Sequence, residues 1–345
     1  MDIWTTFSPR KVAWELTEIM TKGINPTSDW QKQTLLIKDS LKTLKKAGIK
    51  GIRLVIFPSE LTDDGKKFNF QPIDTMLDTC SDVGLLVTLC IGPFQYPYYP
   101  GIYIPQKLLN HIFDNDNALD TNPTLSKYGL QFLELQIERY GNDRRVFGFQ
   151  IANEWPDKQN IESIEKLKKA VSEDFMTHSV SLLKRETEKP IFINTNIDAS
   201  DKNKLTTIYK DLLEGLGKQG KMGFDVYPSQ ETWRNVPLQK IKRLIEPYHK
   251  SFRFMRKKFR RHEMYFAEVE AQPWGNGQSW FELINQEPNP NEKVLNYTRD
   301  SLKKTWKNHI KSTGCKNIGL WGSDFWLSSN NMEINWPLEE VKKLT

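Results

Sequence analysis

Short apolar runs alternate with longer amphipathic stretches along most of this chain. Runs rich in β-branched and aromatic residues predict strands, and stretches with apolar residues three or four positions apart predict helices. The predicted strands span residues 4–7, 51–57, 85–91, 146–153, 191–194, 222–227, 263–267 and 317–321. The predicted helices span residues 30–46, 71–83, 125–140, 161–186, 205–216, 238–260 and 292–312.

Regular alternation of strand and helix is typical of a parallel sheet covered by helices. Eight such units in 345 residues predict an α/β protein that is a single (β/α)8 barrel. The extra length lies mainly in two segments, 93–105 after the third strand and 272–280 after the seventh. We see neither an internal repeat nor a linker, so we expect one domain over residues 1–345.

The bulk composition is that of an ordinary globular protein, with 38% hydrophobic and 27% charged residues. No apolar run approaches the roughly 18 residues that a membrane-spanning helix needs, so we expect no membrane span. The N-terminus has no basic region followed by an apolar core, as a signal peptide would have. We therefore expect a cytoplasmic protein or a secreted protein that has been trimmed, and the compartment stays open.

The formal net charge of +6 is too small to indicate a nucleic-acid partner. The densest basic stretch, residues 253–261, fits the solvated end of a helix, although a surface-adhesion or nucleic-acid role is a weak alternative. The glycines at 215, 217 and 220 match a dinucleotide motif, but a predicted helix precedes them instead of a strand. Neither the three cysteines nor the histidines show metal-type spacing. We expect a monomer without cofactor or metal.

Two of the predicted strands lead directly into a glutamate. The run 146–153 ends in Asn153 and is followed by Glu154, and the run 263–267 is followed by Glu268. Burial of a carboxyl group favours its protonated form, and a glutamate that keeps its proton at neutral pH can donate it to a leaving oxygen. Two carboxyl groups at one mouth of a barrel indicate glycoside hydrolysis, with one acid/base and one nucleophile or base.

The segment that contains Glu268 has a further glutamate two residues later, Glu270. Side chains alternate along a strand, so Glu268 and Glu270 point to the same side and periodicity does not separate them. We favour Glu268 because it directly follows the apolar run, and Glu270 remains the alternative nucleophile.

These residues resemble those of the retaining (β/α)8-barrel glycoside hydrolases of the cellulase-like clan A, and of family 5 in particular. Asn153 and Glu154 follow the fourth strand, and Glu268 follows the seventh. Arg53 on the second strand is similar to the arginine that lies under the nucleophile of that family, and Tyr227 on the sixth is similar to the tyrosine beside it. The resemblance covers almost the whole chain in order.

The resemblance implies a role for each of these residues. Glu268 would attack the sugar, and Glu154 would act first as acid and then as base, with the carboxyl groups about 5–5.5 Å apart as retention requires. Arg53 and Tyr227 would stabilise the ionised form of Glu268. Asn153 would hydrogen-bond the substrate 2-hydroxyl group.

Tryptophans after the predicted strands suggest a carbohydrate substrate, because aromatic rings stack on the faces of sugars. Trp321 or Trp326 resembles the eighth-strand tryptophan that forms the floor of the first sugar subsite, and Trp274 follows the seventh strand. Two positions depart from the family pattern. Many members have a histidine two residues before the sixth-strand tyrosine, where this chain has Asp225, and the histidine usual after the third strand is absent near Gln95.

The sequence therefore predicts a retaining hydrolase of a β-linked glycan or β-glycoside. A transglycosidase of the same fold would use the same residues and differ in how well its acceptor subsite excludes water. A noncatalytic carbohydrate-binding barrel, whose glutamates only hydrogen-bond a sugar, is the alternative from another functional class.

Overall fold

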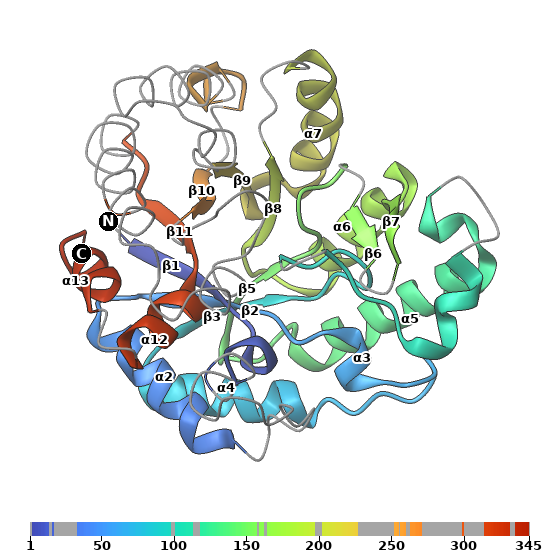
Figure 1. Ribbon diagram of the computed structural model, residues 1–345. Coiled ribbons are helices and arrows are strands. Elements are labelled where there is room, and N and C mark those ends of the chain that lie inside the picture. Colours follow the sequence, from blue (N-terminus) through green and yellow to red (C-terminus); the bar gives the residue numbers. More distant parts are fainter. Residues whose placement is uncertain are drawn as a thin grey trace.

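Eight parallel strands form the closed barrel that the sequence predicts (Figure 1). The computed structural model describes residues 2–13, 16, 33–97, 101–112, 118–156, 159–161, 164–196, 202–226, 252–254, 256–259, 263–270, 299, 314–331 and 335–344. The order around the barrel is β1-β11-β10-β9-β8-β5-β3-β2. The barrel closes because β1 pairs with both β2 and β11.

The barrel strands are short and almost wholly buried. They are β1 (Asp2–Phe7), β2 (Gly51–Leu54), β3 (Leu86–Cys90), β5 (Val146–Gln150), β8 (Ile191–Asn196), β9 (Gly220–Val226), β10 (Glu263–Glu270) and β11 (Asn317–Trp321). Each of the eight predicted strands overlaps one of them. All eight run in the same direction, so their carboxyl ends meet at one mouth, which is where barrel enzymes build their sites.

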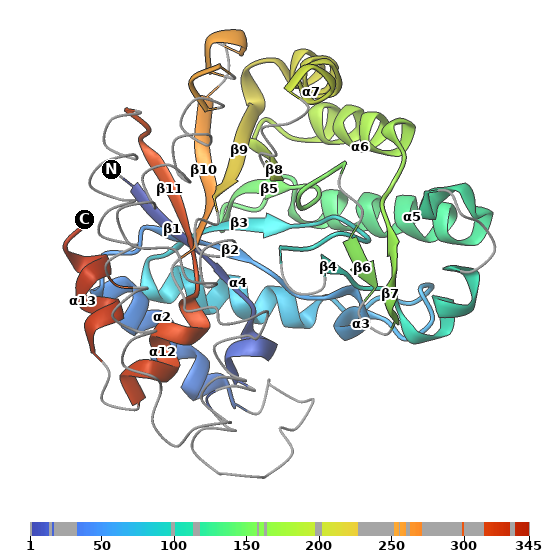
Figure 2. The same ribbon diagram turned by 45° about the horizontal axis from the view of Figure 1, so that its top comes forward.

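Helices lie outside the barrel and cover its strands (Figure 2). The described α-helices are α2 (Thr34–Lys46), α3 (Pro58–Leu61), α4 (Gln71–Val83), α5 (Pro123–Tyr140), α6 (Glu173–Glu186), α7 (Lys202–Leu216), α12 (Ser323–Asn331) and α13 (Trp336–Lys342). Three 3₁₀ helices span Gln106–Ile112, Leu119–Thr121 and Gly217–Gln219. No helix among the described residues is both long and apolar enough to cross a membrane.

The ends of these helices follow local capping chemistry. Asn122 precedes α5, and its side chain accepts hydrogen bonds from the backbone amides of Thr124 and Leu125. Ser172 caps α6 in the same way through the amide of Phe175. Gly84 ends α4 in the left-handed conformation, which glycine adopts without steric cost. Gly84 explains why the predicted end of α4 agrees with the structure.

One predicted helix, 161–186, is wrong over its first part. That part contains β7 (Ile164–Lys169), which pairs antiparallel with β6 (Gln159–Ile161), and β6 pairs in turn with β4 (Gly101–Ile102). The helix α6 begins only after the cap at Ser172. Ile164 and Leu167 are three residues apart and imitate helical spacing, but pairing with β4, distant in sequence, decides the conformation.

The two long segments that we expected differ in what the structure describes. In the segment after β3, Gln95 forms an antiparallel bridge with Ile102 of β4. The segment after β10, residues 272–280, lies outside the described residues, as do most of the predicted helices 238–260 and 292–312.

Two apolar clusters divide the interior. The larger one joins the barrel strands to the surrounding helices. The smaller one consists of Val55, Phe57, Cys90, Tyr96, Tyr103 and Trp321. We call this smaller set the mouth cluster, because its members lie at or just after the carboxyl ends of β2, β3, β4 and β11.

Strands β10 and β11 approach each other closely. The register of β10 against both of its neighbours shifts after Phe266, as at a β-bulge. Beside this irregularity, a Cβ atom added at Gly319 would lie 2.0 Å from the carbonyl oxygen of Ala267. Only glycine fits there, and the close contact fixes the position of the strand that carries Glu268.

We therefore expect Gly319→Ala to lower the free energy of unfolding by at least about 1–3 kcal/mol, because the strands must separate to admit the methyl group. The matched control is Gly215→Ala in α7, where the nearest neighbouring atom would be 3.8 Å from the new Cβ. That change should raise stability by roughly 0.4–1 kcal/mol, since alanine favours the helix. Urea unfolding followed by circular dichroism measures both. Equal stability of Gly319→Ala and the parent would contradict the close approach.

Candidate active site

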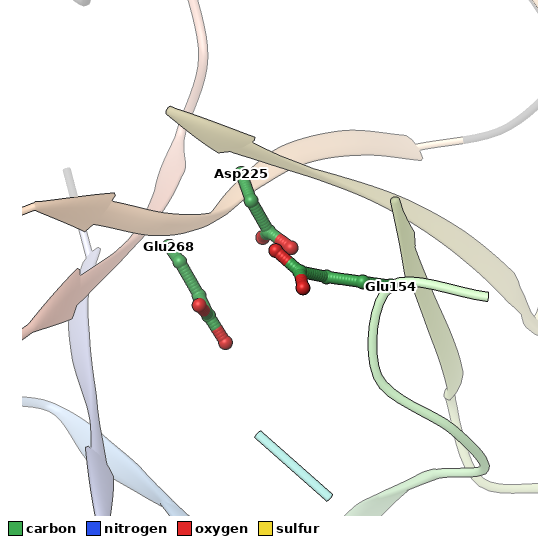
Figure 3. A group of neighbouring side chains, drawn as sticks. All are labelled: Glu154, Asp225 and Glu268. Carbon is green, nitrogen blue, oxygen red and sulfur yellow. The ribbon is translucent and has the colours of Figure 1, made fainter. Parts of the chain in front are cut away.

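Three carboxyl groups meet at the carboxyl-terminal mouth of the barrel (Figure 3). Glu268 lies on β10, Asp225 lies on β9, and Glu154 follows the end of β5 by four residues. One carboxyl oxygen of each residue lies within 4.8 Å of a carboxyl oxygen of the other two. The structure thus brings together the two glutamates that the sequence singled out and adds an aspartate.

The three groups differ in their access to solvent. Asp225 is fully buried and Glu268 is 2% exposed, whereas Glu154 is partly exposed. In Figure 3 the side chains of Glu154 and Asp225 point toward each other across the mouth, and Glu268 enters from the neighbouring strand. Glu154 is therefore the carboxyl group of the three that can exchange a proton with a bound molecule or with water most readily.

Glu154 is held in an unusual backbone conformation. Its φ angle is 50°, in the left-handed region that residues other than glycine rarely adopt. The next residue anchors the turn, because Trp155 is buried and its indole N–H donates a hydrogen bond to the carbonyl of Val171 at 3.0 Å. The ring of Trp155 also packs edge-on against Tyr209. Strain of this kind persists where the surroundings fix it, and it is common at functional sites.

Arg53 pairs with Glu268 inside the barrel. The Nη2 atom of Arg53 lies 2.5 Å from Oε1 of Glu268, and both side chains are at most 5% exposed. The guanidinium group also donates to the hydroxyl group of Thr6 on β1. Burial lowers the pKa of Arg53, but the acidic groups around it, Glu268 foremost, together outweigh burial and leave that pKa above its ordinary value. Arg53 is therefore a permanent cation under Glu268.

Buried amide groups extend this ion pair around the barrel. Nη1 of Arg53 donates to Oε1 of Gln150 at 3.2 Å, and Nε2 of Gln150 donates to Oδ1 of Asn194 at 2.8 Å. Nδ2 of Asn194 then donates to Oδ1 of Asn153 at 2.9 Å and to Oδ2 of Asp225 at 2.6 Å. The chain of hydrogen bonds links β2, β5, β8 and β9, and it fixes which way each amide group points.

Asp225 lacks full compensation for its burial. Burial raises the pKa of its carboxyl group well above the ordinary value, and the charges of Glu268 and Glu154 raise this pKa further. Arg53 and the hydrogen bond from Asn194 act in the opposite direction and do not cancel the effect. Oδ1 of Asp225 has no hydrogen-bond partner among the described residues. The geometry thus favours a neutral, protonated Asp225.

The mouth cluster forms an apolar wall beside the carboxyl groups. It includes Trp321, which is 5% exposed at the end of β11, and Cys90, whose thiol pKa burial raises to about 12. Phe57 stacks on Tyr103 with ring centroids 3.8 Å apart. An apolar wall of this kind strengthens the electrostatic interactions beside it, because it lowers the local dielectric constant.

The remaining expected residues fall into three groups. Trp326 is 1% exposed on α12 and belongs to the larger core cluster, so its position does not support the sugar-stacking role that we expected of it. Tyr227 and Trp274 lie outside the described residues. For Glu270 the structure describes the backbone in β10 but not the side chain.

Sequence reasoning missed Gln150 and Asn194 as members of the site and noted Asp225 only as a departure. A signal was present for each. Gln150 ends an otherwise apolar strand, and Asn194 interrupts the apolar run at 191–194. A lone amide in a barrel strand must find a partner when it is buried. The sequence pattern does not show which group that partner is.

Neither a metal ion nor the cavity at the other end of the barrel is part of the candidate active site. The spacing of the three carboxyl groups would admit a metal ion, but the guanidinium group of Arg53 already neutralises Glu268, and we assign no metal to them. A cavity of about 220 Å³ lies at the opposite, amino-terminal end of the barrel, where Trp4, Phe147 and Tyr265 line it. Apart from Arg53, it contains none of the groups described above, so we do not place the reaction there.

Comparison with known proteins gives a likeness in fold. No protein-family model matches the chain, and no curated protein matches it in sequence. Three solved structures match over 93–100% of the chain. A GH5_18 protein from Streptomyces cattleya in complex with GlcNAc has a TM-score of 0.60 at 10% identity, with 70% of its own length covered.

Two other solved structures show the same barrel. An exo-β-1,4-mannosidase from Opitutaceae bacterium strain TAV5 has a TM-score of 0.59 at 11% identity, with 60% of its length covered. A β-galactosidase from the psychrophilic Marinomonas ef1 has a TM-score of 0.57 at 12% identity. The chain spans 62% of that β-galactosidase, so it corresponds to part of the larger protein. The chain thus shares the barrel fold of these glycoside hydrolase structures.

The ion pair at the centre of the site leads to a test of stability. We expect Arg53→Met to lower the free energy of unfolding by about 3–5 kcal/mol at pH 7, because it leaves the charge of Glu268 buried without its cation. Adding Glu268→Gln to that variant should recover part of the loss, since no unpaired charge then remains. Urea unfolding of the parent, both single variants and the double variant gives the coupling energy. Strictly additive effects would show that the two side chains do not interact.

Proposed function

We propose that this protein is a retaining glycoside hydrolase that cleaves a β-linked glycan or β-glycoside, with Glu268 as nucleophile and Glu154 as acid and base. One observation carries the proposal: carboxyl oxygens of the two glutamates lie within 4.8 Å of each other at the barrel mouth. Retaining enzymes place these groups about 5–5.5 Å apart, whereas inverting enzymes leave about 6.5–9.5 Å for a water molecule.

The first chemical step would form a covalent glycosyl-enzyme. A carboxylate oxygen of Glu268 attacks the anomeric carbon, and the bond from that carbon to the leaving oxygen breaks. Glu154 gives its proton to the leaving oxygen. Arg53 holds Glu268 at a fixed position through the 2.5 Å contact, so the nucleophile is oriented before the substrate arrives.

The second step would reverse these roles. Glu154, now ionised, takes a proton from water, and the water oxygen attacks the anomeric carbon as its bond to Glu268 breaks. The partial exposure of Glu154 suits both steps, because the leaving group and the water have to reach it in turn. Two displacements at one carbon retain the configuration of the sugar.

Asn153 would bind the sugar beside the reacting carbon. Its Oδ1 atom accepts the hydrogen bond from Asn194, which leaves its amide N–H groups to donate to a substrate hydroxyl group. A bond to the 2-hydroxyl group strengthens as positive charge develops on the ring. Trp321 would form the apolar floor of this subsite, with Tyr227 and Trp274 as further contacts.

The solved structures of similar fold support the proposed substrate class. Those named above include a β-galactosidase and an exo-β-1,4-mannosidase. Their likeness is one of fold, and the proposal rests on the carboxyl groups of this chain. A β-linked sugar is thus the substrate to test first.

The proposal predicts that Glu154→Ala and Glu268→Ala each lower kcat on aryl β-glycosides by at least roughly 10²–10⁴-fold. Sodium azide should restore part of the turnover and give different products. In Glu268→Ala the azide takes the place of the nucleophile and yields the α-glycosyl azide, whereas in Glu154→Ala it replaces water and yields the β-glycosyl azide. Proton NMR of the products distinguishes the two anomers.

Glu270→Gln is the matched control for the nucleophile. A 2-fluoro-β-glycoside that traps the covalent intermediate should label Glu268 in the parent and in Glu270→Gln, as peptide mass spectrometry would show. Label on Glu270, or full turnover by Glu268→Ala, would overturn the assignment. A hydroxyl acceptor that captures the sugar better than water does would instead identify a transglycosidase.

A further inference from the structure

Of the three carboxyl groups that meet at the barrel mouth, Asp225 is the one to which the proposed reaction gives no task. Its side chain is fully buried, and one of its oxygens lies within 4.8 Å of an oxygen of each catalytic glutamate. A group in this position affects every charge that the reaction creates.

The charges at the mouth do not balance if all three acids ionise. Glu154, Asp225 and Glu268 would carry three negative charges, and the cation that faces them among the described residues is Arg53. Carboxylates this close, in a site with little water, do not all ionise together. The proposed first step already requires a proton on Glu154 and a charge on Glu268, so the remaining excess falls on Asp225.

The hydrogen bonds locate the proton on one atom. Nδ2 of Asn194 donates to Oδ2 of Asp225 at 2.6 Å, so Oδ2 acts as an acceptor. This orientation of the amide is fixed independently, because Oδ1 of Asn194 accepts from Gln150. Oδ1 of Asp225 is buried without a hydrogen-bond partner among the described residues. A proton on Oδ1 therefore displaces no hydrogen bond among the described residues.

The other titratable neighbours do not supply a charge. Cys90 on β3 and Tyr265 on β10 lie near Arg53 and Glu268, and burial raises the pKa of each. Both are therefore neutral at physiological pH. On the side of β8, Asn194 is an uncharged amide. No cation within the described part of the mouth, other than Arg53, is available to hold Asp225 in its ionised form.

We propose that Asp225 keeps a proton on Oδ1 throughout turnover and acts as a positioning residue for the proposed glycosidase reaction, on which this inference rests. With Asp225 neutral, the mouth carries one negative charge against Arg53 at each stage. That charge is on Glu268 in the free enzyme and on Glu154 in the covalent intermediate. Through Oδ2, Asp225 also orients Asn194 and hence Asn153, which faces the sugar.

Protonation of Asp225 has a consequence for stability that needs no substrate. Above the ordinary aspartate pKa of 3.8 the unfolded chain has released this proton, while the folded protein still holds it. Stability therefore falls as pH rises from there toward the raised pKa of the folded state. Asp225→Asn removes this fall, so the difference in unfolding midpoint between that variant and the parent should shift in favour of the variant as pH rises from 4 to 8.

Asp143→Asn is a matched control with the opposite sign. Arg145 holds the pKa of Asp143 below its ordinary value, through a side-chain contact at 2.5 Å. Asp143 thus contributes stability that is present above the ordinary pKa and lost as pH falls. Its replacement should therefore cost nearly the same stability from pH 8 down to about pH 5, and less only as pH falls below the ordinary pKa of 3.8. An Asp225→Asn series that follows the Asp143→Asn series would overturn the proposal, because it would mean that Asp225 is ionised.

A measurement on the unmodified protein covers the case in which Asp225→Asn fails to fold. Protein labelled with ¹³C at the aspartate carboxyl carbon should keep a resonance at the protonated position at pH 7. Where the variant folds, that resonance should be missing from its spectrum. Spectra of the parent in which every aspartate carboxyl carbon is at the ionised position at pH 7 would refute the proposal.

A measurement of activity separates this inference from the proposed function. In Asp225→Asn, kcat/KM should fall through poorer placement of Asn153, but the pH limits of activity should keep their positions, because a neutral group replaces a neutral one. A shift of either limit by about one pH unit would show that a charge had been removed. If the parent hydrolyses no β-glycoside while its protonated resonance is present, the proposed function fails and the protonation of Asp225 stands.

Discussion

The buried ion pair between Arg53 and Glu268 is the constraint on which the rest of the site depends. Two charges at most 5% exposed are costly to desolvate, and they are tolerable only with close contact and with partners for the remaining polar atoms. Thr6 and Gln150 provide those partners to Arg53. Gln150 is also buried, so its own amide group needs a hydrogen-bond partner, and that partner is Asn194. The buried cation of Arg53 thus accounts for the layer of buried polar side chains under the mouth, which we call the polar layer.

The same layer explains how a rigid scaffold presents a site that faces solvent on one side only. Its members come from β2, β5, β8 and β9, and hydrogen bonds join Arg53 to Gln150, Gln150 to Asn194, and Asn194 to Asp225. Such preorganisation lowers the cost of aligning a nucleophile and an acid with a substrate. Glu154 lies at the edge of this layer, in a left-handed turn that the buried ring of Trp155 anchors. Its partial exposure is consistent with a group that must give up and regain a proton.

Local signals predicted the scaffold well where they matched the tertiary environment. The boundaries of α4 were predictable because Gly84 stops the helix whatever surrounds it. The stretch 161–169 was not, because its apolar spacing fits a helix while β4 offers a strand partner. Trp326 shows the same limit for side chains. Its place after the last strand suggested a sugar platform, but α12 turns the ring into the core.

The sequence by itself determined the eight-strand barrel, the expectation that Glu154 and Glu268 follow its strands, and the placement of Arg53 on the second strand. These features depend on local apolar runs, and each run can be recognised from its own segment of the sequence. Only the tertiary structure decided that Asp225 joins the two glutamates and that Asn194 points its amide toward Asp225. These are contacts across the barrel, such as Arg53 with Glu268 over 215 positions. Strand register sets them, and no local pattern records the register.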